Sequence, residues 1–292
     1  MPAVLVLTAA GDLGDDVIGA VRAALTGRVR LAAARRLAGN AVEMALSGGL
    51  DGVLDIARAA LGDAPVDANA VTTRGRRKQL LICDMDSTII PVECIDEIAD
   101  FAGVKDRVAA ITERAMLGEL DFEAALRERV ALLEGLSEAT LQTVYDERVT
   151  LNPGASEMVQ TMAAGGALTA LVSGGFDFFT ERVAAAAGFQ HHQANRLLVA
   201  DGRLTGLPGD PILGRAAKLE ALQRLSASID AGPLDAVAVG DGANDLAMIE
   251  AAGLGVAYRA KPAVAARSDA QLNHSDLSAV LRLQGIAAKG YS

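Results

Sequence analysis

LLICDMDSTII, residues 80–90, is the stretch of sequence that decides the fold, because an apolar run leads directly into two carboxylates. Leu80–Cys83 has the composition of a short strand that is buried on both faces of a sheet. Asp84 and Asp86 follow it two residues apart, and like charges this close resist being ionised together. The motif therefore predicts a functional site, with a compensating cation, at the end of a buried strand.

Three more short apolar runs follow along the chain, and each leads through glycine, aspartate or serine into other structure. Most are followed by a helical pattern, and this alternation predicts an α/β fold with a doubly wound, Rossmann-like parallel sheet. Such sheets bind ligands at the carboxyl ends of their strands. The runs are ALTALVS (167–173), DAVAVG (235–240) and GLGVAY (253–258).

Two insertions interrupt this alternation. Between the first and second strands, the periodic segments of residues 91–152 predict a small helical cap. Later, ANRLLVADGRLTG (194–206) predicts a hairpin that turns at Asp201 and Gly202. The core domain, residues 76–292, is therefore expected to carry a cap after its first strand.

Residues 1–75 have a different pattern, with strands and helices in the order β-α-β-β-α-β. This order predicts a ferredoxin-like α+β domain with both helices on one face of the sheet. Its second strand is expected in RVRLAAARRLA (28–38), as one continuous segment. The basic segment TTRGRRKQ (72–79) predicts a solvated linker to the core domain.

Composition and charge set limits on function. The chain has 292 residues, of which 51% are hydrophobic, and a formal net charge of −10. This charge argues against a nucleic-acid partner, and an anionic substrate would need a local cation. Neither a signal peptide nor a membrane span is predicted, and Cys83 and Cys94 are expected to be reduced thiols. We therefore expect a cytoplasmic protein without a membrane partner.

Polar residues also follow the other strands of the predicted sheet. Ser173 and Gly174 end the second strand, where a hydroxyl and open backbone N–H groups form an anion site. GDGAND (240–245) follows the third strand, and Lys218 lies near the start of the helix before it. Each feature alone also has a purely structural explanation, since Asp241 could cap a helix and a lysine on a helix is usually solvated. Together they predict a site for Mg²⁺, which takes oxygen ligands.

DMDST (84–88), VSGG (172–175), Lys218 and GDGAND occur in the order of the motifs of the haloacid dehalogenase (HAD) superfamily of phosphatases, which the chain resembles. More narrowly, Glu93 in PVECIDEIA, the segment FEAALRERVALLEG (122–135) and the hairpin are similar to the phosphoserine phosphatase family. The resemblance implies Mg²⁺-dependent hydrolysis of O-phospho-L-serine to L-serine and phosphate through an aspartyl-phosphate. This reaction is the last step of serine biosynthesis.

The resemblance also implies a role for each residue at the strand ends. Asp84 is expected to be the nucleophile, and Asp86 to protonate the seryl oxygen and then deprotonate the hydrolytic water. Lys218 is expected to pair with Asp84 and the phosphate. The implied Mg²⁺ ligands are Asp84, the backbone carbonyl of Asp86 and Asp241, with Asp245 in support.

The other residues implied by the resemblance bind the substrate. Glu93 is expected to face the ammonium group of phosphoserine, and Arg129 to bind its carboxylate, which a guanidinium matches in shape. Hydrogen bonds to charged groups contribute roughly 1.5–3 kcal/mol each, so two such anchors favour phosphoserine over a bare phosphate ester. Ser173 and Gly174 are expected at the phosphoryl group, and Asn244 at the phosphate or in the metal shell. Met116 and Phe122 are expected on the cap side of the pocket.

The N-terminal unit resembles the ACT domains that precede many such phosphatases, which commonly bind amino acids and dimerise. The resemblance implies a regulatory or dimerisation domain, and hence a homodimer. Two other classes of function remain open. One is a HAD phosphatase or phosphotransferase that acts on another small phosphomonoester, which Glu93 with Arg129 argues against. The other is a non-catalytic amino-acid sensor, which the complete set of strand-end residues argues against.

Overall fold

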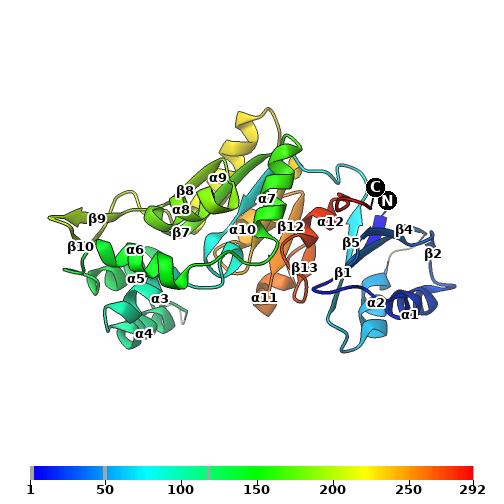
Figure 1. Cartoon of the computed structure of the whole chain (residues 1–292), viewed down its shortest axis with the longest axis horizontal. Helices are drawn as coiled ribbons and strands as arrows, with labels where there is room; N and C mark the ends of the chain where they lie inside the picture. The colour runs from blue at the N-terminus through cyan, green and yellow to red at the C-terminus, as the bar shows by residue number, and fades with distance from the viewer. Residues whose placement is uncertain (1–2, 49–50, 117–118, 292) are drawn as a thin grey trace.

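The computed structural model describes residues 3–48, 51–116 and 119–291. The chain is elongated: an N-terminal sheet lies at one end, the parallel sheet lies in the middle, and the cap helices and a hairpin lie at the other end (Figure 1). Within the described ranges, no helix is long and apolar enough to cross a membrane.

Six parallel strands form the central sheet, in the order β13-β12-β11-β6-β7-β8. This confirms the predicted parallel α/β core, and all four residues of β6 are buried in it. The sequence pattern does not predict the edge strands β8 and β13. The strands are β6 (Leu80–Cys83), β7 (Leu168–Phe176), β8 (His191–Asn195), β11 (Ala236–Gly240), β12 (Leu254–Tyr258) and β13 (Ala270–Leu272).

The side chains of the central strands alternate between two apolar cores, since successive residues of a strand point to opposite faces. Leu81 and Cys83 belong to one core, and Leu80 and Ile82 belong to the other. Burial on both faces explains the continuous apolar runs in the sequence. Helices α7 (Ala155–Ala164), α8 (Asp177–Ala187) and α12 (Ala279–Leu283) pack in the first core, and α9 (Arg215–Ser228) and α10 (Leu246–Ala251) pack in the second. Two short helical segments complete the domain, η2 (Pro233–Asp235) and α11 (Pro262–Ala265).

A helical cap follows β6, as predicted. The chain leaves β6 through a short irregular turn, η1 (Met85–Ile89), in which Asp86 and Ser87 have non-helical backbone angles, and the cap helices follow before the chain returns to the core. The predicted hairpin is also present, and its turn residues Asp201 and Gly202 have φ values of +51° and +71°, as a tight hairpin turn requires. The cap helices are α3 (Cys94–Phe101), α4 (Lys105–Met116), α5 (Phe122–Ala131) and α6 (Ala139–Arg148), and the hairpin strands are β9 (Leu197–Ala200) and β10 (Arg203–Pro208).

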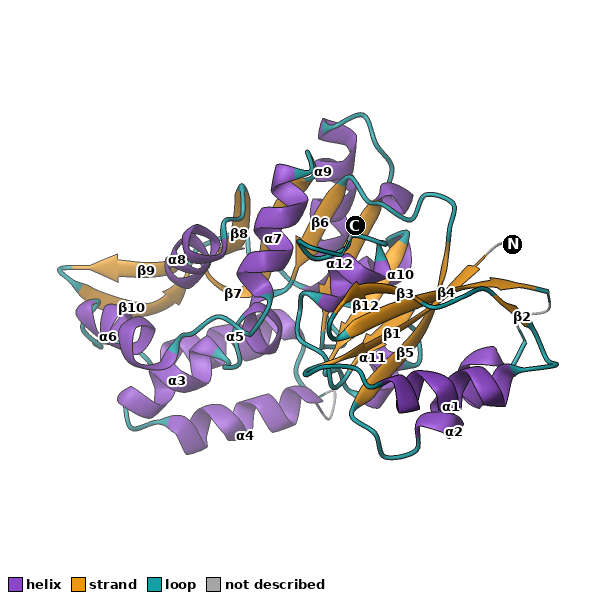
Figure 2. Ribbon diagram, turned by 45° about the vertical axis from the view of Figure 1, so that its right-hand side comes forward, coloured by secondary structure: helices purple, strands orange, loops and turns teal. Residues whose placement is uncertain are grey.

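The N-terminal unit is an antiparallel sheet with both helices on one face (Figure 2). The strand order is β2-β4-β1-β5, with β3 also paired to β4, which is a ferredoxin-like arrangement. The predicted single strand at residues 28–38 is wrong, because the pairing with β4 slips by one residue between β2 and β3. The elements are β1 (Ala3–Ala9), α1 (Asp15–Leu25), β2 (Arg30–Leu31), β3 (Arg35–Ala38), β4 (Ala41–Ser47), α2 (Val53–Leu61) and β5 (Val66–Thr72).

Side chains of β5 fasten this unit to the edge of the central sheet. The buried carboxylate of Asp67 accepts hydrogen bonds from three consecutive backbone N–H groups, those of residues 273–275, at 2.8–3.3 Å. Two residues along the strand, Asn69 exchanges two hydrogen bonds with the backbone of Gln271 in β13. Arg76 of the predicted solvated linker is mostly buried and donates to the carbonyls of Arg282 and Leu283. The linker is therefore part of the junction.

We expect Asp67→Ala to lower the free energy of unfolding by about 2–4 kcal/mol, because it removes the acceptor of the buried Ser275 N–H and of the partly buried N–H groups of residues 273 and 274. Urea unfolding measures this change. Asp63→Ala, at an exposed position in the turn before β5, is the control and should change the free energy by less than about 0.5 kcal/mol. A loss below 1 kcal/mol for Asp67→Ala would contradict the interpretation of the junction.

Candidate active site

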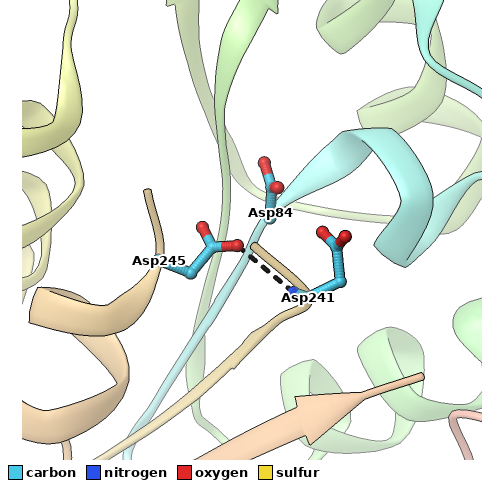
Figure 3. Close-up of side chains that lie close together, drawn as sticks. All are labelled: Asp84, Asp241 and Asp245. Atoms are coloured by element: carbon cyan, nitrogen blue, oxygen red, sulfur yellow. Dashed lines mark hydrogen bonds between the residues drawn. The ribbon is translucent and has the colours of Figure 1, made fainter. Parts of the chain in front are cut away.

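Three carboxylates converge where the central strands β6 and β11 end. Asp84 directly follows β6, Asp241 directly follows β11, and Asp245 precedes α10. Each offers one oxygen, and these oxygens lie within 4.8 Å of one another. Figure 3 shows the three side chains grouped at the strand ends. The structure therefore brings these three predicted residues together at the carboxyl edge of the sheet.

Lys218 lies between two of these carboxylates. Its Nζ is 2.6 Å from Asp84 Oδ1 and 2.5 Å from Asp245 Oδ1, and the residue is only 3% exposed. Burial alone would lower the pKa of Lys218, but the carboxylates of Asp245 and Asp84 outweigh burial and raise the pKa above its usual value. The ammonium group therefore stays charged and fixes the positions of both carboxylates.

Asp245 is held by the backbone of its own turn. Its Oδ2 accepts hydrogen bonds from the N–H of Asp241 at 3.2 Å, drawn in Figure 3, and from the N–H of Gly242 at 3.0 Å. Glycine is required at Gly240, because a Cβ there would lie 2.5 Å from the Asp245 carboxylate. Asp245 thus holds both the backbone of Asp241 and the ammonium group of Lys218.

The site carries more negative than positive charge. Burial and the neighbouring Asp245 raise the pKa of Asp84 well above its ordinary value, and the same two causes raise the pKa of Asp241 to about 6. Three carboxylates that face one ammonium group in a buried site favour a further cation. Carboxylate oxygens are the donors that a hard divalent cation takes. The residues therefore fit a metal ion held by Asp84 and Asp241.

Asp86 faces a different set of partners, although it is only two residues from Asp84. Its Oδ1 accepts a hydrogen bond from the backbone N–H of Cys94 at 3.0 Å, and its Oδ2 accepts one from the Ser173 hydroxyl at 3.3 Å. Burial and the charge of Glu93 raise the pKa of Asp86 to about 7. The two carboxylates of the opening motif are thus distinct, because Asp84 pairs with a cation and Asp86 with neutral donors.

The end of β7 brings the Ser-Gly-Gly segment against Asp86. The Gly175 N–H donates to the Ser173 hydroxyl at 2.8 Å, and Ser173 is 2% exposed. A Cβ at Gly175 would lie 2.8 Å from Asp86 Oδ2, so this close approach needs glycine. Ser173 and Gly175 therefore lie beside Asp86, with Gly174 between them in the chain.

The cap reaches this segment through Phe122, the first residue of α5. A Cβ added at Gly174 would lie 3.1 Å from the Phe122 ring, and one added at Gly214 would lie 3.6 Å from it. Phe122 is thus on the site, between two glycine-containing segments of the core. Met116 ends α4, but its side chain lies outside the described residues.

The predicted anchors for the substrate lie around the same space. The exposed Glu93 accepts a hydrogen bond from the Ser87 hydroxyl at 2.6 Å. Arg129 is half-buried, and its Nε donates to the Ala125 carbonyl at 3.2 Å. Burial lowers the pKa of Arg129, while Asp96, Glu93 and Asp86 act in the opposite direction. Among the residues that the structure describes, Arg129 forms no ion pair within 4 Å, so its terminal nitrogens can bind an anion.

Asn244 is half-buried, and its side chain lies directly over Gly242 in the turn. Three polar residues near the site carry no predicted role. Thr88 donates to Asp241 Oδ1 at 3.4 Å, and Asn152 donates to the Thr88 carbonyl at 2.7 Å. Asn195 ends β8 and bonds to Gly174. Thr88 belongs to the DMDST motif and Asn195 to the ANRLLVADGRLTG segment, which are their only sequence signals, and no sequence pattern marks Asn152.

Comparison with known proteins agrees with this geometry. The family model for haloacid dehalogenase-like hydrolases matches residues 81–250, which contain the strand ends, the cap and Lys218. The phosphoserine phosphatase of Idiomarina loihiensis is 47% identical over 202 residues, which are 69% of this chain and 91% of that protein.

Two solved structures match nearly the whole chain. The probable phosphoserine phosphatase from Vibrio cholerae has a TM-score of 0.83 and 33% identity, and the match covers 98% of this chain and 87% of that one. A HAD family hydrolase from Salmonella enterica serovar Typhi has a TM-score of 0.87 and 30% identity, with 97% and 98% of the two chains covered. Both matches include the N-terminal unit, since they extend well beyond the core domain.

Proposed function

The chain belongs to the haloacid dehalogenase-like hydrolase family, among its phosphoserine phosphatases, and from this premise we propose how its residues perform the reaction. The protein hydrolyses O-phospho-L-serine to L-serine and phosphate, the last step of serine biosynthesis. The residue assignment rests on one observation: the two carboxylates of the DMDST motif have different hydrogen-bond and ion-pair partners. Asp84 is fixed by Lys218, whereas Asp86 bonds to Cys94 and Ser173.

Asp84 is the nucleophile in this proposal. Its Oδ1 is occupied by Lys218 Nζ at 2.6 Å and by the backbone N–H of Met85 at 2.8 Å. Oδ2 has no hydrogen-bond partner among the described residues, and it is the oxygen that attacks phosphorus. The new bond joins Oδ2 to phosphorus while the bond between phosphorus and the seryl oxygen breaks, which gives an aspartyl-phosphate.

Asp86 moves the proton in both halves of the reaction. It donates a proton to the departing seryl oxygen, so that serine leaves as the neutral alcohol. It then accepts a proton from the water that attacks the aspartyl-phosphate and regenerates Asp84. Its hydrogen bonds to the Cys94 N–H and the Ser173 hydroxyl hold the carboxyl beside the phosphoryl site, which Ser173 and Gly174 line.

We propose that the metal ion of this family is Mg²⁺ in this protein. Asp84, Asp241 and the backbone carbonyl of Asp86 would hold it, with Asp245 and Asn244 in support. When bound, it neutralises charge on the phosphoryl oxygens and on the carboxylates. Lys218 supplies the second positive charge, because its Nζ lies 2.6 Å from the nucleophile.

Substrate choice is assigned to the cap. In this proposal Glu93 faces the substrate ammonium and Arg129 binds the carboxylate, which the absence of an ion pair of Arg129 among the described residues supports. Phe122, packed over Gly174, closes the pocket against water, and Met116 is proposed on the same wall. This arrangement favours phosphoserine over other small phosphomonoesters, and measurement of phosphate release across a panel of them, with and without Mg²⁺, tests the proposed function. Faster turnover of another phosphomonoester, or transfer of the group to an added alcohol, would contradict it.

Arg129→Ala is expected to lower kcat/KM for phosphoserine by about 10–100-fold, because it removes a charged hydrogen-bond partner of the carboxylate. O-phosphoethanolamine is the matched control substrate, since it lacks only that carboxylate, and its kcat/KM should change by less than about threefold. Steady-state kinetics on both substrates measures the difference. An equal loss on both would assign Arg129 to the structure of the cap.

The remaining predictions concern the whole chain. We propose that residues 1–75 form an ACT-like domain that regulates or dimerises the protein and that residues 76–292 form the phosphatase domain, in a cytoplasmic protein. The antiparallel sheet of the N-terminal unit supports the first part of this proposal. The oligomeric state in solution tests the dimer.

A further inference from the structure

Asn195 is a buried side chain whose hydrogen bonds join two segments of the active site. It ends β8 and is 2% exposed. Its Nδ2 donates to the Gly174 carbonyl at 2.8 Å and to the Leu213 carbonyl at 3.4 Å, and its Oδ1 accepts from the Leu213 N–H at 2.6 Å. One amide group thus links the end of β7 to the segment that precedes α9.

Both linked segments reach functional groups within a few residues. Gly174 lies in the chain between Ser173 and Gly175, the two residues that contact Asp86. Leu213 precedes Gly214, and α9 then begins and carries Lys218 in its first turn. Phe122 of the cap packs against the glycines of both segments, at Gly174 and Gly214. The distance between these two segments therefore determines how Phe122 of the cap packs against the core.

The hairpin that leaves Asn195 is also bonded to the cap. β9 begins two residues after Asn195, and the Gly209 N–H bonds back to the Arg196 carbonyl, which closes the hairpin base. At the other end, backbone hydrogen bonds connect Leu204 with Gly135 and Leu136 of the cap at 2.8 Å. Figure 2 shows the hairpin beside α5 and α6. Asn195 thus lies where the cap-bound hairpin joins the core.

We propose that Asn195 is a positioning residue. It holds the phosphoryl-binding segment, the start of α9 and the glycines that contact Phe122 of the cap in the arrangement that catalysis requires. The inference rests on the proposed function, because it deepens the assignment of Ser173, Gly174 and Lys218. Without the amide, Gly174 and Leu213 lose their shared partner, and the groups on each segment move independently. Misplacement by about 1 Å costs as much as 100-fold in rate.

The test compares Asn195→Ala with Thr169→Val. Thr169 is fully buried at the opposite end of the same strand pair, where its hydroxyl accepts a hydrogen bond from the Gln190 N–H at 3.1 Å. Each variant removes buried hydrogen bonding between β7 and the β8 region, but only Asn195 touches the site. We measure the thermal midpoint, kcat and KM for phosphoserine, and calorimetric binding of orthophosphate in the presence of Mg²⁺.

Asn195→Ala should lower kcat by about 10–100-fold and weaken orthophosphate binding about tenfold, while Thr169→Val keeps both within twofold. Asn195→Asp keeps the acceptor for Leu213 but cannot donate to Gly174, so it should show the same losses, and it decides the matter if Asn195→Ala does not fold. Near wild-type kcat and orthophosphate binding in the folded Asn195 variant, or equal losses in Thr169→Val, would overturn the inference. A wild-type protein inactive on phosphoserine would contradict the proposed function instead, and orthophosphate binding would still test Asn195.

Discussion

Asp84→Asn abolishes phosphate release from O-phospho-L-serine, with kcat lower by about 10³-fold or more. An amide oxygen is a poor nucleophile, and the substitution adds no heavy atom at Asp84, which is 4% exposed. Lys218 keeps its partner Asp245 at 2.5 Å, so no buried charge is left unpaired. We therefore expect the fold to be intact, with a circular dichroism spectrum like that of the wild type.

The control for this substitution is Asp100→Asn, because Asp100 is an exposed carboxylate of α3 outside the site. Its kcat should stay within twofold of the wild type. Substantial activity of Asp84→Asn, at or above about a tenth of the wild type, would show that another group attacks phosphorus. An Asp84→Asn variant that is inactive because it has unfolded would show that the pair with Lys218 is needed for stability.

Removal of divalent metal is the second large effect. Exhaustive treatment with a chelator should reduce phosphoserine turnover to the background rate, and Mg²⁺ should restore it, because three carboxylates and one ammonium group leave the site short of positive charge. A ligand that binds only the folded state raises its stability, so Mg²⁺ should also raise the thermal midpoint.

Asp241→Asn tests whether Mg²⁺ raises the thermal midpoint by binding at this site or only through a general effect of salt. Asp241 has no lysine partner within 4 Å among the described residues, so its loss should remove the Mg²⁺-dependent rise of the thermal midpoint and leave the protein folded. Full activity of the wild type after chelation would contradict the metal assignment. So would an unchanged response of Asp241→Asn to Mg²⁺.

The sequence predicts the central part of the fold well and its edges poorly, for a physical reason. β6, β7, β11 and β12 lie inside the sheet, and burial on both faces gives them continuous apolar runs. β8 (HHQAN) lies at an edge and is partly exposed, so it has no apolar run. β13 has three residues, and its outer edge meets side chains of β5, a contact between residues about 200 positions apart. No local pattern predicts such a contact.

The same distinction holds in the site. Asp84, Asp241 and Lys218 stand out in the sequence because they lie at the ends of buried strands or of a helix, where an unpaired charge is costly. The sequence does not show that Lys218 bonds to Asp245 as well as Asp84, because that depends on how α9 packs beside the turn. The hydrogen bonds of Asn195 are likewise visible only in the structure. Its segment stands out in the sequence, but the bonds to Gly174 and Leu213 depend on how β7 and the residues before α9 pack against it.

The central claim is that the phosphoryl group passes through Asp84. A single turnover of wild-type protein with phosphoserine, quenched within milliseconds and reduced with borohydride, tests it most directly, because borohydride converts an aspartyl-phosphate to homoserine. Mass spectrometry of the peptide that contains residues 80–90 then identifies the modified residue. We predict homoserine at position 84 and an unchanged Asp86. Modification of Asp86 or another residue, or turnover without any modified peptide, would contradict the account.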